Sequence, residues 1–125
     1  MSKPKAQGTA FETWIVKRLS TLEGVVERVW RLAEGGMHDQ GDIEFWLSVT
    51  PERWVVEAKA RERLNVPREL SKARLKSGVP SRTVLFWKRL TLKDGNTKRT
   101  PDGEPVVVCM GLDTFESLIS RGGES

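Results

Sequence analysis

An acid and a base lie two positions apart in an otherwise apolar stretch, WVVEAKA, at residues 54–60. Successive side chains of a strand point to opposite faces, so Glu57 and Lys59 share one face with Val55. Charged side chains are rarely buried unless they are paired or bound to a ligand. The pattern therefore indicates a functional role for Glu57 and Lys59.

A second carboxylate, Asp42, begins the alternating segment DIEFWLSV. Thr50-Pro51-Glu52 predicts a turn that folds this segment back onto the strand of Glu57. If the turn is centred near residue 51, the numbers of cross-strand partners add to about 102. We therefore expect Asp42 opposite residue 60, within reach of Lys59.

Two carboxylates and an ammonium at one end of a hairpin are suited to phosphodiester hydrolysis. Neighbouring carboxylates repel each other and favour a cation between them. Mg²⁺ takes oxygen ligands of this kind, with waters and substrate phosphate completing its shell, and it acidifies a coordinated water. The lysine can orient that water or stabilise charge on the phosphate. Mn²⁺ is expected to substitute for Mg²⁺, and a solvent-facing cross-strand salt bridge is the alternative interpretation.

The residues Gly41-Asp42-Ile43 followed by Glu57-Ala58-Lys59 resemble the motif of the PD-(D/E)xK nuclease superfamily, with Gly41 in place of the proline. The opening residues 7–12, QGTAFE, are similar to the start of archaeal-type Holliday junction resolvases. As a small Trp-rich chain, the protein also resembles the resolvases carried by bacteriophages. The resemblance covers about residues 7–90. It implies a restriction-endonuclease-like fold and a homodimer that cuts four-way DNA junctions in recombination and repair.

The same resemblance implies the roles of four residues: Glu12, Asp42, Glu57 and Lys59 form the catalytic set, and the three acids hold the metal. Glu12 has a second interpretation, because Thr9 and Glu12 have capping-box spacing and Glu12 could serve only the helix start. His38 and Gln40 lie in the loop before Asp42. They are candidates for contact with DNA, and polar surface is the alternative for both.

Basic residues are concentrated after the strand of Glu57. Residues 61–99 contain 12 Lys and Arg against 3 acids, within a chain of net charge +4. Such a distribution favours a polyanion partner, bound through phosphate contacts that do not read bases. The predicted phosphate-binding residues of the strand end and the following helix are Arg61, Arg63, Arg68, Lys72, Arg74 and Lys76.

The coarse pattern predicts one α/β domain over residues 1–125, with a mixed central sheet flanked by helices in the order α-β-β-β-α-β-β-α. The expected helices cover 9–22, 67–77 and 113–120, and the expected strands cover 25–32, 42–49, 53–60, 83–90 and 105–110. Residues 91–104 are expected to form a hairpin arm or loop, and residues 1–7 and 122–125 to be flexible.

Composition excludes several classes of protein. The single cysteine rules out an intramolecular disulfide or a cysteine metal cluster and favours a reducing cytoplasmic setting. No apolar run is long enough to span a membrane, and we expect no signal peptide. Three other functions stay open: another nuclease of the same superfamily (nicking, flap or restriction-like), a non-catalytic DNA-binding relative, and a basic structural protein.

Overall fold

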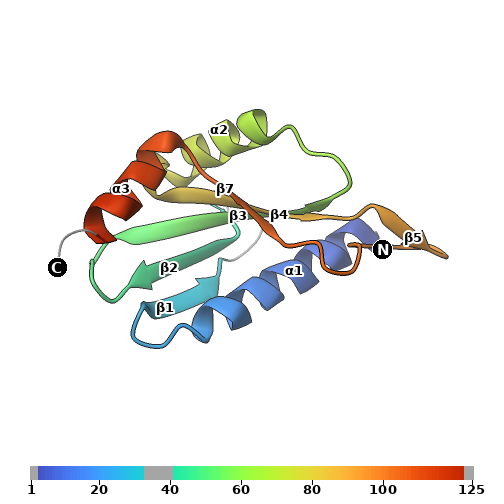
Figure 1. Ribbon diagram of the computed structural model, residues 1–125, viewed down its shortest axis with the longest axis horizontal. Helices are drawn as coiled ribbons and strands as arrows, with labels where there is room; N and C mark the ends of the chain where they lie inside the picture. The colour runs from blue at the N-terminus through green and yellow to red at the C-terminus, as the bar shows by residue number, and fades with distance from the viewer. Residues whose placement is uncertain (1–2, 33–40, 123–125) are drawn as a thin grey trace.

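The computed structural model describes residues 3–32 and 41–122, and in this part of the chain a mixed five-stranded sheet is flanked by three helices (Figure 1). The main elements are α1 (Lys3–Ser20), β1 (Val26–Arg31), β2 (Ile43–Leu47), β3 (Arg53–Arg61), α2 (Val66–Ser77), β4 (Thr83–Arg89), β7 (Val107–Cys109) and α3 (Leu112–Gly122). A 3-10 turn, η1 (Pro80–Arg82), leads into β4. This confirms the expected α/β class and element order and is consistent with a restriction-endonuclease-like fold.

The sheet has the strand order β1-β2-β3-β4-β7, so β3 is its central strand. Neighbouring strands are antiparallel except for β3 and β4, which are parallel and joined through α2. Parallel neighbours require such a crossover, because a hairpin turn cannot connect them. The strand that carries Glu57 and Lys59 is therefore bonded to a neighbour on both sides.

Two layers cover opposite faces of the sheet. Side chains of α1 pack into a core with alternate residues of the strands, among them Phe11, Ile15, Ile43, Trp54, Val56 and Val84. Leu118 of α3 packs against the same core. The other face carries Val55 and Glu57, and α2 lies over it, since Lys76 contacts Glu57 and Ser77 bonds to Thr83 of β4. The side of β3 that bears the charged pair is thus enclosed by α2.

Local sequence accounts for the ends of α2. The side chain of Asn65 accepts a hydrogen bond from the Arg68 amide at 3.3 Å, Pro67 lies in the first turn, and Gly78 ends the helix at φ 77°. These are the residues that favour a helix start and a helix stop, respectively. The predicted helix over 67–77 is confirmed, with its start one residue earlier at Val66.

The first helix departs from the expectation at its start. It begins at Lys3 instead of Thr9, because residues 3–8 extend the helix in spite of Pro4 and Gly8. Thr9 therefore lies inside the helix and cannot be its N-cap, so the capping-box interpretation of Glu12 is wrong. Residues 3–7, within the segment 1–7 that was expected to be flexible, have helical backbone.

The expected arm is a small hairpin of its own, formed by β5 (Leu92–Asp94) and β6 (Thr97–Arg99) around Gly95. All six strand residues of this hairpin are exposed. It is linked to the main sheet by an ion pair between Lys98 and Glu62 at 3.3 Å. In the described part of the chain, no helix has the length and apolar character needed to cross a membrane.

Candidate active site

Asp42 and Glu57 lie directly opposite each other. Ile43 pairs with Val56 across β2 and β3, and the Asp42 amide donates to the Val56 carbonyl at 3.1 Å. Partner numbers therefore add to 99 and not to about 102, so the predicted pairing of Asp42 with residue 60 is wrong. The turn is centred between residues 49 and 50, one residue and a half before the predicted position near Pro51. The corrected register brings the two carboxylates closer together than expected.

The Asp42 carboxylate is held by the backbone of β3. The Ala58 amide donates to Asp42 Oδ2 at 2.7 Å. Burial, followed by repulsion from Glu57, raises the pKa of Asp42 from its ordinary value to about 6, although the Ala58 hydrogen bond lowers it. Repulsion from Glu12 adds to the increase and attraction to Lys76 opposes it. Ionisation of both carboxylates at once is therefore unfavourable, a condition that a bound cation relieves.

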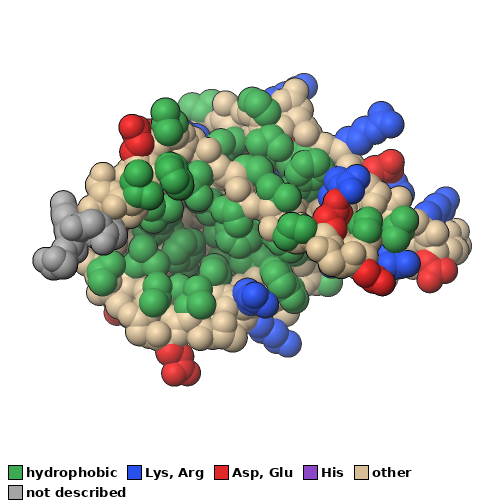
Figure 2. All heavy atoms as spheres, in the orientation of Figure 1, with side chains coloured by type: hydrophobic (Ala, Val, Ile, Leu, Met, Phe, Trp, Pro, Cys, Tyr) green, Lys and Arg blue, Asp and Glu red, His purple; other side chains and the backbone are tan. Residues whose placement is uncertain are grey.

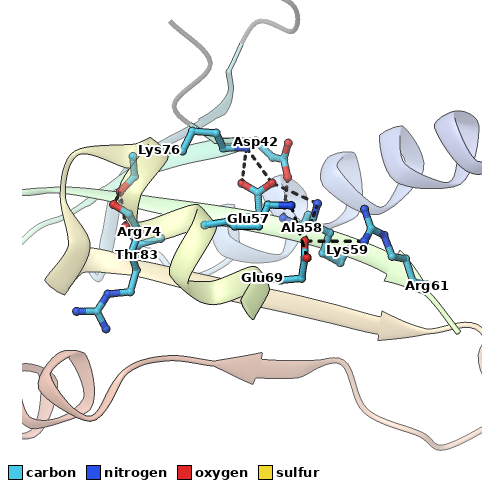
Figure 3. Close-up of polar contacts among 11 residues, drawn as sticks. Asp42, Glu57, Ala58, Lys59, Arg61, Glu69, Arg74, Lys76 and Thr83 are labelled. Atoms are coloured by element: carbon cyan, nitrogen blue, oxygen red, sulfur yellow. Dashed lines mark hydrogen bonds and ion pairs between the residues drawn. The ribbon is translucent and has the colours of Figure 1, made fainter. Parts of the chain in front are cut away.

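Glu57 is almost completely buried, with 5% of its surface exposed, and two lysines approach it (Figure 3). Lys76 Nζ of α2 is 3.1 Å from each carboxylate oxygen, and Lys59 Nζ is 3.6 Å from Oε1. The contact of Lys76 with Oε2 is an ion pair without hydrogen-bond geometry. The two lysines together provide the positive charge around the buried Glu57 carboxylate.

Lys59 lies between two carboxylates. Besides Glu57, its ammonium is 3.8 Å from Glu69 Oε1 in the first turn of α2. Glu69 also lies 3.9 Å from Arg61 and 3.8 Å from Lys72, and its side chain is only 12% exposed. Glu69 was not identified from the sequence, because its role depends on how α2 lies over β3. It fixes the position of the catalytic-motif lysine.

Glu12 is buried on α1, with its Oε1 3.2 Å from Arg31 Nε of β1. It is near enough to Asp42 to raise that residue's pKa. However, the described residues contain no group of three or more His, Cys, Asp or Glu side chains arranged to hold a metal ion. The structure thus does not gather Glu12, Asp42 and Glu57 into the predicted three-carboxylate metal site. Asp42 and Glu57 are the pair that it brings together.

Gly41 explains the departure from the proline of the motif. Its φ is +141°, which proline cannot adopt, and an added Cβ would lie 2.4 Å from Val55 Cγ1. The same Cβ would lie 4.0 Å from Glu57 Oε2. The backbone of residue 41 is therefore packed tightly against β3, and this contact sets the position of Asp42.

A cavity of about 490 Å³ opens beside the carboxylates. Its lining includes Glu57, Lys59, Glu69, Lys72 and Lys76. One face of α2 thus adds Lys72 and Lys76 to Lys59 of β3 around this space. The space borders Glu57, which together with Asp42 is here called the acidic pair. Such a space can accept an anionic group close to the carboxylates.

The predicted phosphate-binding residues have different surroundings. Arg61, Arg63 and Arg68 are exposed near the start of α2. Arg74 instead forms a two-point ion pair with Asp113 of α3, at 3.0 and 2.7 Å, which ties the two helices together. His38 and Gln40 lie outside the described residues. Among the predicted phosphate-binding residues, Lys72 and Lys76 of α2 line the cavity that Glu57 also lines.

Comparison with known proteins does not assign the chain to a family: no family model, curated protein or solved structure matches it.

Proposed function

We propose that the protein is a Mg²⁺-dependent endonuclease that cuts branched DNA, with the catalytic residues of a PD-(D/E)xK nuclease. The observation that carries the proposal is the carboxylate pair of Asp42 and Glu57 at one cross-strand position, with Lys59 two residues further along β3. A salt bridge alone does not explain why a second carboxylate, Asp42, lies half-buried against Glu57 near a lysine-lined cavity. Phosphodiester hydrolysis at a metal site explains this arrangement.

Asp42 and Glu57 fit a hard divalent cation by the nature of their donors. Both offer carboxylate oxygens, and the pKa of Asp42 is raised first by burial and then by repulsion from Glu57, a repulsion that a cation between them would relieve. Two carboxylates with waters and substrate phosphate are a usual Mg²⁺ environment, whereas Glu12 is not gathered with them. When bound there, the ion supplies Lewis-acid chemistry at the phosphate and an acidified water.

The protein's own residues do the remaining work. Lys59, held by Glu57 and Glu69, is positioned to orient the attacking water or to stabilise charge on the phosphate. The Ala58 amide keeps Asp42 directed into the site. Lys72 and the exposed arginines near the start of α2 attract the DNA backbone, so binding should weaken steeply with added salt. A protein of this kind acts in the reducing cytoplasm, which the single cysteine permits.

Four-way junctions are the proposed substrate, and they present two equivalent cleavage points that a homodimer can engage. A surface for a second copy is available over the sheet and α3, where hydrophobic side chains gather around a hollow (Figure 2). On α3, Leu112, Phe115 and Ile119 are between 50% and 72% exposed.

The first test is cleavage of a labelled immobile four-way junction and of a linear duplex with the same sequence, with Mg²⁺ or with EDTA. Paired symmetric nicks in the junction alone, and only with Mg²⁺, are expected. Asp42→Asn and Glu57→Gln should abolish cleavage and largely retain junction binding, while Glu27→Gln, at an exposed position of β1, should cut normally.

Other outcomes of this test correspond to the competing functions. Cutting of duplex as well would keep the chemistry and indicate a nicking, flap or restriction-like nuclease. Tight DNA binding without cutting would indicate a non-catalytic relative in which Lys59 and Lys76 neutralise Glu57 permanently. Cleavage by Asp42→Asn at the wild-type rate would overturn the assignment of the site.

A further inference from the structure

The catalytic face of the sheet continues beyond the acidic pair onto β1 and β2. Trp30 pairs with Glu44, and Arg28 pairs with Trp46. Glu44 and Trp46 lie two and four residues after Asp42, so the alternation of the strand places all three on one face. Helix α2 covers the β3 and β4 part of this face. Beside it, Trp30 remains 42% exposed.

The two tryptophans and the arginine form one cluster, here called the aromatic platform (Arg28, Trp30 and Trp46). The ring centroids of Trp30 and Trp46 are 5.0 Å apart and tilted by 47°. The Arg28 guanidinium lies 4.3 Å from the Trp46 centroid and 5.7 Å from that of Trp30. Two inclined aromatic rings, with a cation over that of Trp46, therefore lie on the open part of the sheet.

The orientation of Trp30 is set by polar contacts. Its Nε1 donates to Glu44 Oε1 at 2.7 Å, and Glu44 Oε2 accepts from Arg53 Nε at 2.6 Å. By comparison, Trp54 is the tryptophan of the core, with 2% exposure. A large aromatic residue that is fixed in orientation and left half-exposed is a recognition feature more than a packing feature.

We propose that the aromatic platform binds an unpaired nucleobase of the DNA whose backbone is cut at Asp42 and Glu57. This inference rests on the proposed nuclease function and names the part of the substrate that the neighbouring surface holds. Bases stack on exposed aromatic rings regardless of sequence, and an arginine adds a cation–π contribution. Branched DNA with single-stranded segments, or a branch point opened on binding, exposes such bases, whereas intact duplex does not.

The location of the platform supports a nucleobase as its occupant. Glu44, the partner of Trp30, lies two residues from Asp42, a distance of about 7 Å along the strand. Two base steps of stacked DNA span about the same distance. A strand with its phosphate at the acidic pair thus has a base within reach of the platform. Arg28 is also complementary to the charge of the strand's phosphates.

The test measures binding of short single-stranded oligonucleotides by fluorescence anisotropy in EDTA, over a range of salt concentrations. The variants are Trp30→Leu and Trp30→Phe, and each is measured with a normal strand and with a strand of the same length made entirely of abasic sites. Trp30→Leu should bind the normal strand about tenfold more weakly with an unchanged salt slope. Trp30→Phe should restore most of the affinity, because it retains an aromatic ring.

The abasic strand separates stacking from every other effect. Wild type and Trp30→Leu should bind it equally, since no base is present to stack. An equal affinity of both proteins for the normal strand would overturn the inference, as would an equal loss on both strands. The second result would mean that Trp30 supports the fold or a protein partner. Unfolding midpoints of the variants show directly whether the fold is intact.

The inference and the proposed function fail in distinguishable ways. Junction cleavage by wild type together with unchanged strand binding by Trp30→Leu would leave the nuclease in place and remove the platform. Base-dependent binding through Trp30 without any metal-dependent cleavage would keep the platform as a binding site and remove the nuclease.

Discussion

Lys76 is the residue that most changes the interpretation of the site. The sequence pattern places it among phosphate-binding residues, but the structure places its ammonium 3.1 Å from both oxygens of Glu57. It therefore supplies the positive charge that the acidic pair needs in the absence of a metal ion. The Lys76 side chain is 32% exposed, and lysine has a flexible four-carbon stem. The ammonium can therefore leave Glu57 and turn toward a phosphate.

Replacing Lys76 by methionine should make divalent cations bind about tenfold more tightly, because a hydrogen bond to a charged group contributes roughly 1.5–3 kcal/mol and no longer competes. Titration calorimetry with Ca²⁺ measures the affinity without turnover. Lys72→Met is the matched control, as this lysine of the same helix face pairs with Glu69 instead. Equal cation affinity of Lys76→Met and wild type would contradict the idea of competition.

Asp42 should make stability depend on pH. Its pKa of about 6 in the folded protein lies above the value near 3.9 of an unfolded chain, so the folded state binds the proton more tightly. The resulting stabilisation is complete below about pH 4 and is lost as the pH rises through about 6. Asp42→Asn, which stays neutral, should therefore be more stable than wild type by about 1–3 kcal/mol at pH 7, and equally stable near pH 4.

Urea unfolding of both proteins at several pH values measures this difference, with Glu27→Gln as the control that should follow wild type. A difference that stayed constant between pH 4 and 8 would show that ionisation of Asp42 is not its cause. Cation binding should also weaken below about pH 6, since the ion must displace the proton from Asp42.

At the scale of elements, the join between residue 41 and β3 determines the geometry of the carboxylates. Gly41→Ala should destabilise the protein by roughly 1–3 kcal/mol and weaken cation binding, because the new Cβ meets Val55 at 2.4 Å and φ stays positive. Gly8→Ala is the control: nothing lies within 4 Å of that Cβ, and it should stabilise α1 by up to about 1 kcal/mol. Thermal unfolding and Ca²⁺ titration of both variants provide the measurement, and a Gly41→Ala variant as stable as wild type would contradict it.

The elements themselves could be predicted because alternation and helical spacing are strong local signals. The hairpin β2–β3, the capped helix α2 and strand β4 follow directly from their patterns. The start of α1 was missed because Gly8 and Pro4 resemble helix-stopping signals, whereas both lie in its first turns. The hairpin register was missed because it depends on the length of the turn, and a turn residue such as Pro51 gives only its approximate position.

The candidate site was predictable only in part. Two of its residues, Glu57 and Lys59, lie on β3, and Asp42 precedes β2, the hairpin partner of β3. Strand alternation and hairpin pairing therefore place the three residues together. Lys76 and Glu69 reach the site from α2, and their placement depends on how a helix packs across a sheet. No local pattern contains that information.

At the scale of the whole molecule, the apolar surface over α3 should mediate self-association. Phe115→Asp should turn a dimer into a monomer, because it places a charge in the centre of the exposed stripe of α3. Sedimentation equilibrium measures the change in mass. Leu75→Asp is the control, since Leu75 is 86% exposed on α2 and should leave association unchanged. A monomeric wild-type protein at micromolar concentration would contradict the prediction.

The position of β3 has a further consequence for the way in which activity is lost. This strand pairs with β2 from Arg53 to Val56 and with β4 from Val55 to Arg61, and the Ala58 amide is bonded to the Asp42 carboxylate. Amide hydrogens so protected exchange with solvent only when the whole domain opens. Glu57 and Ala58 therefore lie within the slowest-exchanging segment of the chain. Denaturant should then abolish activity and folded structure in a single transition. No partly unfolded form should retain the fold without the site, or the site without the fold.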